Sequence, residues 1–385
     1  MLAEPGALAV VFAGLCTFLD LYATQALLPM LTRDFGATPA DVSLTVTATT
    51  FAVALIAPFI GAVSDALGRK RLIVAAMFAL VLPTIMIARV DGLGAMVFWR
   101  FVQGLLLPPI FAVTVAYVGE EWPPARATTV TGIYVAATAF GGFLSRFLSG
   151  LIAEHLGWRP AFLVLAAITL VCAAAVAWLM PRERHFIRSG GLLASGRFML
   201  GHLANPQLVA TFGVGFGVLF SFIAVFTYID FVLVAPPFEL STAALGSIFV
   251  VYLIGLWIAP LTGILVRRLG RRRLVALAIG LWICALLLTF GKSLMLILAA
   301  LTICAACGFV CQSCATSYVA ISARQARSSA VGLYVTFYYV GGSAGGVTAG
   351  FAWNLAGWPG CVAAVAVVLA LIAALVLRFW REANV

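Results

Sequence analysis

The chain has 385 residues, of which 64% are hydrophobic and only 9% are charged. Soluble domains carry about 25% charged residues, so this composition excludes a soluble globular protein and indicates a membrane protein. The net charge of +10 does not indicate nucleic-acid binding, because the Lys and Arg residues gather in short segments between apolar runs, as they do in membrane proteins.

The apolar runs number twelve, and each is close to the ~20 residues that cross a bilayer. The first carries Asp20 and is too long for a signal peptide, so we expect it to be retained as a spanning helix. We predict an all-α membrane protein with a six-helix bundle in residues 1–181, a cytoplasmic linker in 182–205 and a second six-helix bundle in 206–385. The runs lie near residues 6–31, 41–64, 72–90, 94–118, 128–152, 160–180, 207–234, 242–266, 274–291, 293–318, 329–352 and 359–378.

The distribution of Lys and Arg predicts the orientation. With a cytoplasmic amino terminus, seventeen of these residues lie on the cytoplasmic side, and two, Arg100 and Arg146, lie within spans. Four lie on the other side: Arg33, Arg89, Arg159 and Lys292. Because cytoplasmic loops collect basic residues, we expect both termini and the central linker to be cytoplasmic.

A loop signature occurs twice, about half a chain apart. The first copy runs from Gly61 to Leu72 as GAVSDALGRKRL, and the second from Gly263 to Leu274 as GILVRRLGRRRL. The fifth and eleventh runs also correspond, with GIY at 132–134 matching GLY at 332–334, and GG at both 141–142 and 341–342. Two copies of an even number of spans have the same orientation, so the pattern predicts two bundles related by a parallel pseudo-two-fold axis along the membrane normal.

The first loop resembles the signature of the major facilitator superfamily, Gly-x-x-x-Asp-x-x-Gly-Arg-Lys/Arg-Arg, at Gly61, Asp65, Gly68, Arg69 and Arg71. The stretches DLYATQALLP at 20–29 and RFVQG at 100–104 are similar to helix 1 and helix 4 of the twelve-helix drug:proton antiporters. The GGxxxR and YYxGG runs at 141–146 and 338–342 resemble the YnfM-like efflux branch. The fifth run lacks the Gly-Pro pair that the antiporters carry.

This resemblance implies a proton-coupled transporter that works by alternating access and exports a small organic solute such as a drug, a sugar or a weakly anionic amphiphile. It also implies that Asp65 contacts a helix amino terminus and a loop arginine, forming a cytoplasmic gate with Gly61, Gly68, Arg69 and Arg71. We expect no enzymatic activity and no cofactor, and we expect a monomer in a bacterial inner membrane, with the proton and the lipid bilayer as further partners.

Three charges lie within predicted spans: Asp20, Arg100 and Arg146. Intramembrane charges usually face a cavity or a partner, and a rise of 1.5 Å per residue places all three at similar depth, roughly 21–27 Å from the cytoplasmic helix ends. We therefore expect Asp20 to alternate between binding a proton and pairing with an arginine. Arg146 replaces the glycine found at 346 in the second copy, so packing alone does not require it.

Polar and aromatic residues of the apolar runs are candidates for a substrate cavity, and each has helix–helix packing as its alternative. Together with Arg146 they are Tyr22, Gln25, Gln103, Tyr134, Gln312, Tyr338 and Tyr339. We expect Asp230, near the end of its run, to be solvated.

The tenth run carries Cys304, Cys307, Cys311 and Cys314 at helical spacing. Thiolates bind soft metals, so a soft-metal carrier is one alternative function, although packing is the simpler explanation of these small side chains. An importer that uses the same fold in symport is the other alternative.

Overall fold

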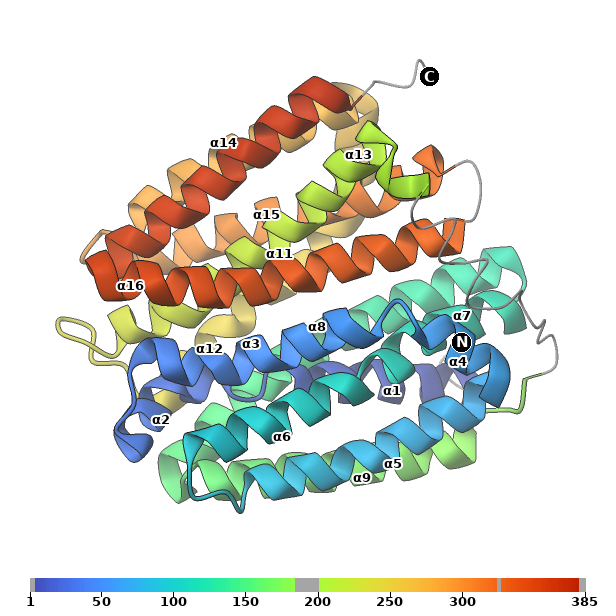
Figure 1. Ribbon diagram of the computed structural model, residues 1–385, viewed down its shortest axis with the longest axis horizontal. Helices are drawn as coiled ribbons and strands as arrows, with labels where there is room; N and C mark the ends of the chain where they lie inside the picture. Colours follow the sequence, from blue (N-terminus) through green and yellow to red (C-terminus); the bar gives the residue numbers. More distant parts are fainter. Residues whose placement is uncertain (1–3, 184–200, 324–326, 381–385) are drawn as a thin grey trace. The chain divides into compact units, whose positions relative to one another are not determined.

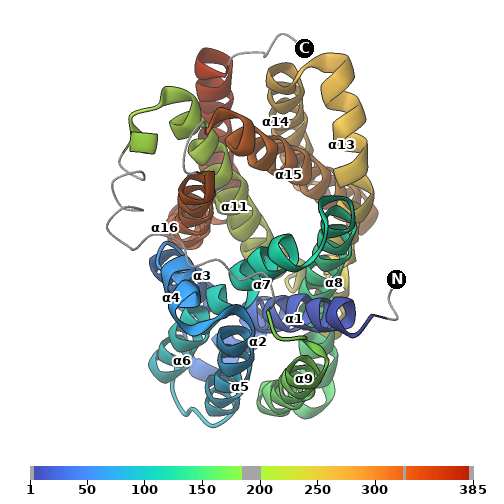
Figure 2. The same ribbon diagram turned by 90° about the vertical axis from the view of Figure 1, so that its right-hand side faces the viewer.

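Helices account for almost all of the structure. The computed structural model describes residues 4–183, 201–323 and 327–380, and within these ranges every regular element is a helix (Figure 1, Figure 2). A backbone that crosses lipid must satisfy its own hydrogen bonds, and an α-helix does so within one segment. The predicted all-α fold is confirmed.

Packing divides the chain into two compact units, of which the first comprises Met1–Gly36, Ala48–Leu192 and Ser241–Ser247. Its elements are α1 (Pro5–Leu21), η1 (Gln25–Leu27), α2 (Leu28–Phe35), α4 (Ile60–Leu67), α5 (Arg69–Ile87), α6 (Leu93–Leu106), α7 (Pro108–Glu121), α8 (Pro124–Leu156), α9 (Trp158–Leu179) and α12 (Thr242–Ile248). Within this unit α1 packs against α8 and α9, and α9 also packs along α5.

The second unit comprises Ala37–Thr47, Leu193–Leu240 and Ile248–Val385, and α3 (Pro39–Ile56) contributes to both units. Its remaining elements are α11 (Pro206–Leu233), η2 (Phe249–Ile254), α13 (Gly255–Leu269), α14 (Arg271–Leu288), α15 (Leu294–Ser322) and α16 (Arg327–Phe379). Within this unit, α11 packs along α16 (Figure 1). The predicted linker lies mostly outside the described residues, so the division of the chain at 182–205 stays a prediction.

Length and hydropathy identify nine membrane-spanning candidates among the described residues, or ten when the bent pair Thr242–Ile258 and Leu261–Leu269 is counted as one span. One candidate, Ser329–Phe379, has 51 residues, whereas the bilayer core needs ~20. It breaks at Gly357, where φ is 61° and ψ is −144°, and so supplies two spans. α14 begins with three arginines, and these charges keep it out of the candidates counted above. It corresponds to the remaining one of the twelve spans expected from the sequence.

The internal repeat is visible in how the helices pack. In the first unit, a Cβ built on Gly141 of α8 would lie 2.4 Å from the carbonyl oxygen of Leu15 in α1. In the second unit, a Cβ on Gly341 of α16 would lie 2.0 Å from the carbonyl oxygen of Phe216 in α11. Both contacts leave no room for a side chain, so the repeated Gly-Gly pair serves the same close helix approach in each copy.

A similarly close crossing brings α12 against α8 in the first unit. A Cβ on Gly150 would lie 2.6 Å from the Thr242 carbonyl oxygen, and one on Gly246 would lie 2.4 Å from the Arg146 carbonyl oxygen. One turn further along α8, Glu154 accepts a hydrogen bond of 2.7 Å from the Ala243 amide. These contacts explain why Ser241–Ser247 belongs to this unit.

Candidate functional site

The carboxylate of Asp20 lies at the end of α1 and is fully buried, with 0% of the residue exposed. Thr84 of α5 donates its hydroxyl to Oδ1 at 3.0 Å, and Thr169 of α9 donates to Oδ2 at 2.8 Å. The α1–α9 and α5–α9 packing brings these three helices together. Neither threonine stands out in the sequence, because a threonine in a membrane helix ordinarily bonds its own backbone.

Arg100 of α6 lies beside Asp20 but binds the backbone. Its guanidinium donates to the carbonyl oxygens of Asp20 at 2.7 Å and of Leu21, which are among the last carbonyls of α1. These carbonyls have no partner within the helix, and a cation is favoured at this negative end of the helix dipole. The structure therefore gives Arg100 a position at the end of α1.

Gln103, one turn after Arg100, connects the guanidinium to the carboxylate. Its side-chain oxygen accepts from Arg100 at 2.6 Å, and its amide nitrogen donates to the Thr84 hydroxyl at 2.7 Å and more weakly to Asp20 Oδ1 at 3.4 Å. We call Asp20, Thr84, Arg100, Gln103 and Thr169 the carboxylate cluster. Three of the five were singled out by the sequence.

Arg146 of α8 forms a second group with Gln25 and Tyr22. Its Nε and Nη2 atoms donate to Gln25 Oε1 at 2.8 and 2.6 Å, and Nη1 donates to the Gly142 carbonyl oxygen at 2.6 Å. The guanidinium carbon lies 4.3 Å from the centroid of the Tyr22 ring, within cation–π range. We call Tyr22, Gln25 and Arg146 the arginine cluster. The expected pairing of Asp20 with an arginine stays a prediction.

The remaining candidates for a substrate cavity belong to neither cluster. Tyr134 is buried in the first unit and donates its hydroxyl to the Phe111 carbonyl oxygen at 3.2 Å. Gln312, Tyr338 and Tyr339 belong to the second unit, where the two tyrosine rings meet with centroids 5.4 Å apart. That these residues line one cavity with the arginine cluster stays a prediction.

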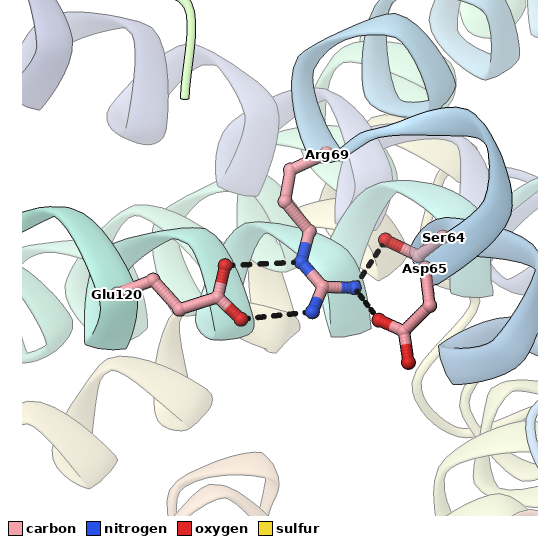
Figure 3. Close-up of polar contacts among 4 residues, drawn as sticks. All are labelled: Ser64, Asp65, Arg69 and Glu120. Atoms are coloured by element: carbon pink, nitrogen blue, oxygen red, sulfur yellow. Dashed lines mark hydrogen bonds and ion pairs between the residues drawn. The ribbon is translucent and has the colours of Figure 1, made fainter. Parts of the chain in front are cut away.

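The signature loop forms an ion-pair network around Arg69 (Figure 3). Arg69 Nη1 contacts Asp65 Oδ1 at 2.8 Å and donates to Ser64 Oγ at 2.6 Å. On the other side Nε and Nη2 bind both carboxylate oxygens of Glu120 in α7, at 3.1 and 2.8 Å. The expected pairing of Asp65 with a loop arginine is present, whereas Glu120 was not foreseen, since it lies outside the motif.

The other motif positions have different surroundings. Gly68 joins α4 to α5 with φ of +89°, a conformation that favours glycine, and Gly270 occupies the same position in the second copy with φ of +76°. Gly61 faces open space, and Arg71 is exposed. These two make no described contact with the Arg69 network, so their place in a gate stays a prediction.

The cysteine stripe of α15 is buried. Cys304, Cys307, Cys311 and Cys314 are each at most 4% exposed. Across the described ranges, no group of three or more His, Cys, Asp or Glu side chains is arranged to hold a metal ion.

Asp230 corrects one expectation. It is fully buried in α11, with 0% exposed, and is not solvated as its place near the end of the run suggested. A helix end can be covered by neighbouring elements, which depth along the sequence does not reveal.

Comparison with known proteins identifies the family. A sequence model of the Major Facilitator Superfamily matches residues 10–235 and, a second time, 214–384. The chain belongs to the major facilitator superfamily. Among its relatives in this superfamily, the inner membrane transport protein YnfM of Escherichia coli is 32% identical over 97% of this chain and 90% of its own length. The uncharacterized MFS-type transporter YybF of Bacillus subtilis is 31% identical over 93% and 89%.

Solved structures of the superfamily share the fold. The nucleoside transporter NupG, as its D323A mutant, has a TM-score of 0.80 at 15% identity, covering 97% of this chain and 100% of its own. A bacterial homolog of the lysosomal transporter Spinster has a TM-score of 0.74 at 16% identity, covering 98% of both chains. At these sequence identities the structural similarity shows a shared fold and does not indicate a shared substrate.

Proposed function

We propose that this member of the superfamily is a proton-coupled secondary transporter that exports a small organic solute, with Asp20 as the proton-binding residue. The observation that carries the proposal is the burial of the Asp20 carboxylate among hydroxyl and amide groups of three other helices. Ionisable residues within a membrane are costly and mark proton or substrate pathways.

The threonine hydroxyls suit a carboxyl group that gains and loses a proton. A hydroxyl has one hydrogen to donate and two lone pairs to accept. Thr84 Oγ1 lies 3.0 Å from Asp20 Oδ1 and 2.8 Å from the Leu80 carbonyl oxygen. It can donate to the ionised carboxylate, or turn its hydrogen to Leu80 and accept from the protonated form. The cluster can therefore solvate both states of Asp20.

The arginine cluster is our candidate for the solute's anionic or hydrogen-bonding group. Tyr22 and Gln25 follow Asp20 by two and five residues in the chain, so a movement of the end of α1 would displace residues of both clusters. The second copy supports a special role for Arg146, because Gly346 at the matching position is packed so closely that a Cβ would lie 2.2 Å from Thr47 Oγ1. Position 146 instead accommodates a long charged side chain.

Export, rather than symport, rests on the resemblance of the helix 1 and helix 4 stretches to drug:proton antiporters, and the cytoplasmic placement of both termini rests on the distribution of Lys and Arg. A bacterial plasma membrane fits the E. coli relative, whose name places it in the inner membrane.

A solute is first identified by a thermal-shift screen of sugars, organic acids and amphiphilic drugs on the purified protein, because a ligand that binds the folded state raises its melting temperature. The solute is then offered to proteoliposomes with a pH gradient. Antiport predicts accumulation inside vesicles with an acidic interior. Accumulation only when the exterior is acidic would show symport, and indifference to the gradient would contradict proton coupling.

A further inference from the structure

A cavity of about 650 Å³ lies outside both clusters, where α5 begins and α9 ends. Three of its lining side chains are basic, namely Lys70, Arg71 and Arg182, and one, Glu183, is acidic. The others are aliphatic and include Val74 of α5 and Ala177 of α9. The cavity thus combines an excess of positive charge with an apolar wall.

The basic end of the cavity already holds an internal anion. Glu183 Oε2 lies 3.4 Å from the Lys70 backbone nitrogen in the first turn of α5, where the helix dipole favours negative charge. The Lys70 ammonium group donates to the Met180 carbonyl oxygen, which holds the chain segment after α9 against α5. An external anion bound here would be attracted by three cationic side chains and would compete with the Glu183 carboxylate for them.

The surface next to the cavity is apolar and exposed. Phe78 and Leu82 lie three and seven residues beyond Ala75, on the face of α5 that Arg71 and Ala75 share, and are 42% and 56% exposed. On α9, Val171 is 67% exposed. Trp178, beside Ala177, is 86% exposed, and exposed tryptophans of membrane helices gather at the level of the lipid head groups.

We propose that this cavity binds the head group of an anionic phospholipid. The phosphodiester would lie among Lys70, Arg71 and Arg182, and an acyl chain would run along the exposed apolar side chains of α5 and α9. Basic pockets between membrane helices bind such head groups. Glu183 would be displaced when the lipid binds, so its carboxylate competes with the phosphodiester and lowers the affinity of the cavity for the lipid.

The test uses the full-length protein in detergent micelles with phosphatidylglycerol or phosphatidylcholine of identical acyl chains. Native mass spectrometry counts bound lipid, and thermal unfolding reports stabilisation. We expect phosphatidylglycerol alone to bind and stabilise. Each neutralised cation should weaken phosphatidylglycerol binding about fivefold. The triple variant Lys70→Gln, Arg71→Gln and Arg182→Gln should therefore bind this lipid about 100-fold more weakly than the wild type. The control, Arg89→Gln, removes an exposed cation after the other end of α5 and should change nothing.

Glu183→Gln keeps the test decisive if the triple variant fails to fold. Removing the competing carboxylate should strengthen phosphatidylglycerol binding severalfold. Weaker or unchanged binding in that variant would overturn the proposal, as would equal binding of the two lipids. Glycerol phosphate, which lacks acyl chains, should give no stabilisation at the concentrations where the lipid does. A matching stabilisation would show a site for soluble anions and overturn the assignment to lipid.

Discussion

The hydroxyls of Thr84 and Thr169 help to set how tightly Asp20 holds a proton. A hydrogen bond to a charged group is worth about 1.5–3 kcal/mol, and each hydroxyl donates to the ionised carboxylate. Thr84→Val or Thr169→Val removes one donor and so favours the protonated form. We expect the pH profile of proton-driven flux to move up by about one unit. An unchanged profile in both variants would show that these bonds do not act on the coupling carboxyl group.

Arg146 is expected to act on solute affinity. Arg146→Gln removes the cation that lies over Tyr22 and binds Gln25, and a charged hydrogen bond to the solute contributes about 1.5–3 kcal/mol. The dissociation constant of the solute found by thermal shift should rise at least tenfold, measured by calorimetry. Arg159→Gln, which removes a half-exposed arginine, is the matched control. Wild-type affinity in Arg146→Gln would return this residue to a structural role.

The sequence could predict which charged residues enter the membrane, because charge in an apolar run is conspicuous. It could not predict that Arg100 binds the end of α1 or that two threonines hold Asp20. Which way a hydroxyl or a guanidinium points depends on the rotation of neighbouring helices, and that rotation follows from packing along the whole unit. The same limit explains the wrong expectation for Asp230.

Among the helices, Arg69 joins α4, α5 and α7 through Asp65 and Glu120. The Arg69 side chain is 8% exposed and that of Glu120 is 27% exposed, so solvent screens the pair only in part. Glu120→Gln leaves the guanidinium without one carboxylate and should lower the free energy of unfolding by about 1.5–3 kcal/mol, the contribution of hydrogen bonds to a charged group. Thermal unfolding measures this loss, with the exposed Glu239→Gln as control. Equal melting temperatures would show that the network contributes nothing to stability in this state.

The α8–α12 crossing depends on glycine at 246. In Gly246→Ala the new methyl group would lie 2.4 Å from a backbone carbonyl oxygen of α8, so one helix must move. We expect the melting temperature to fall by several degrees, equivalent to about 1–3 kcal/mol of overpacking. Gly280→Ala, in α14 with open space around it, should leave stability unchanged or raise it, because alanine favours a helix. A similar outcome for both variants would contradict the close crossing.

For the whole molecule, the all-helical fold and the superfamily followed from apolar run length and the repeated loop. These features can be read from short segments of the sequence, and a bilayer allows an apolar run of this length few backbone conformations. The contact of Glu120 with Arg69 and the packing of Ser241–Ser247 with the first unit could not be predicted. Each depends on contacts between residues far apart in the chain.

The central claim is that one buried carboxyl group couples protons to the solute. Asp20→Asn keeps the size and most hydrogen bonds of the side chain but cannot ionise, and the fully exposed Asp91→Asn is its control. The direct measurement is solute accumulation in proteoliposomes with an acidic interior, beside exchange of labelled for unlabelled solute without a gradient. We predict that Asp20→Asn exchanges solute but accumulates none, while Asp91→Asn behaves as wild type. Gradient-driven accumulation by Asp20→Asn at the wild-type level would contradict the account.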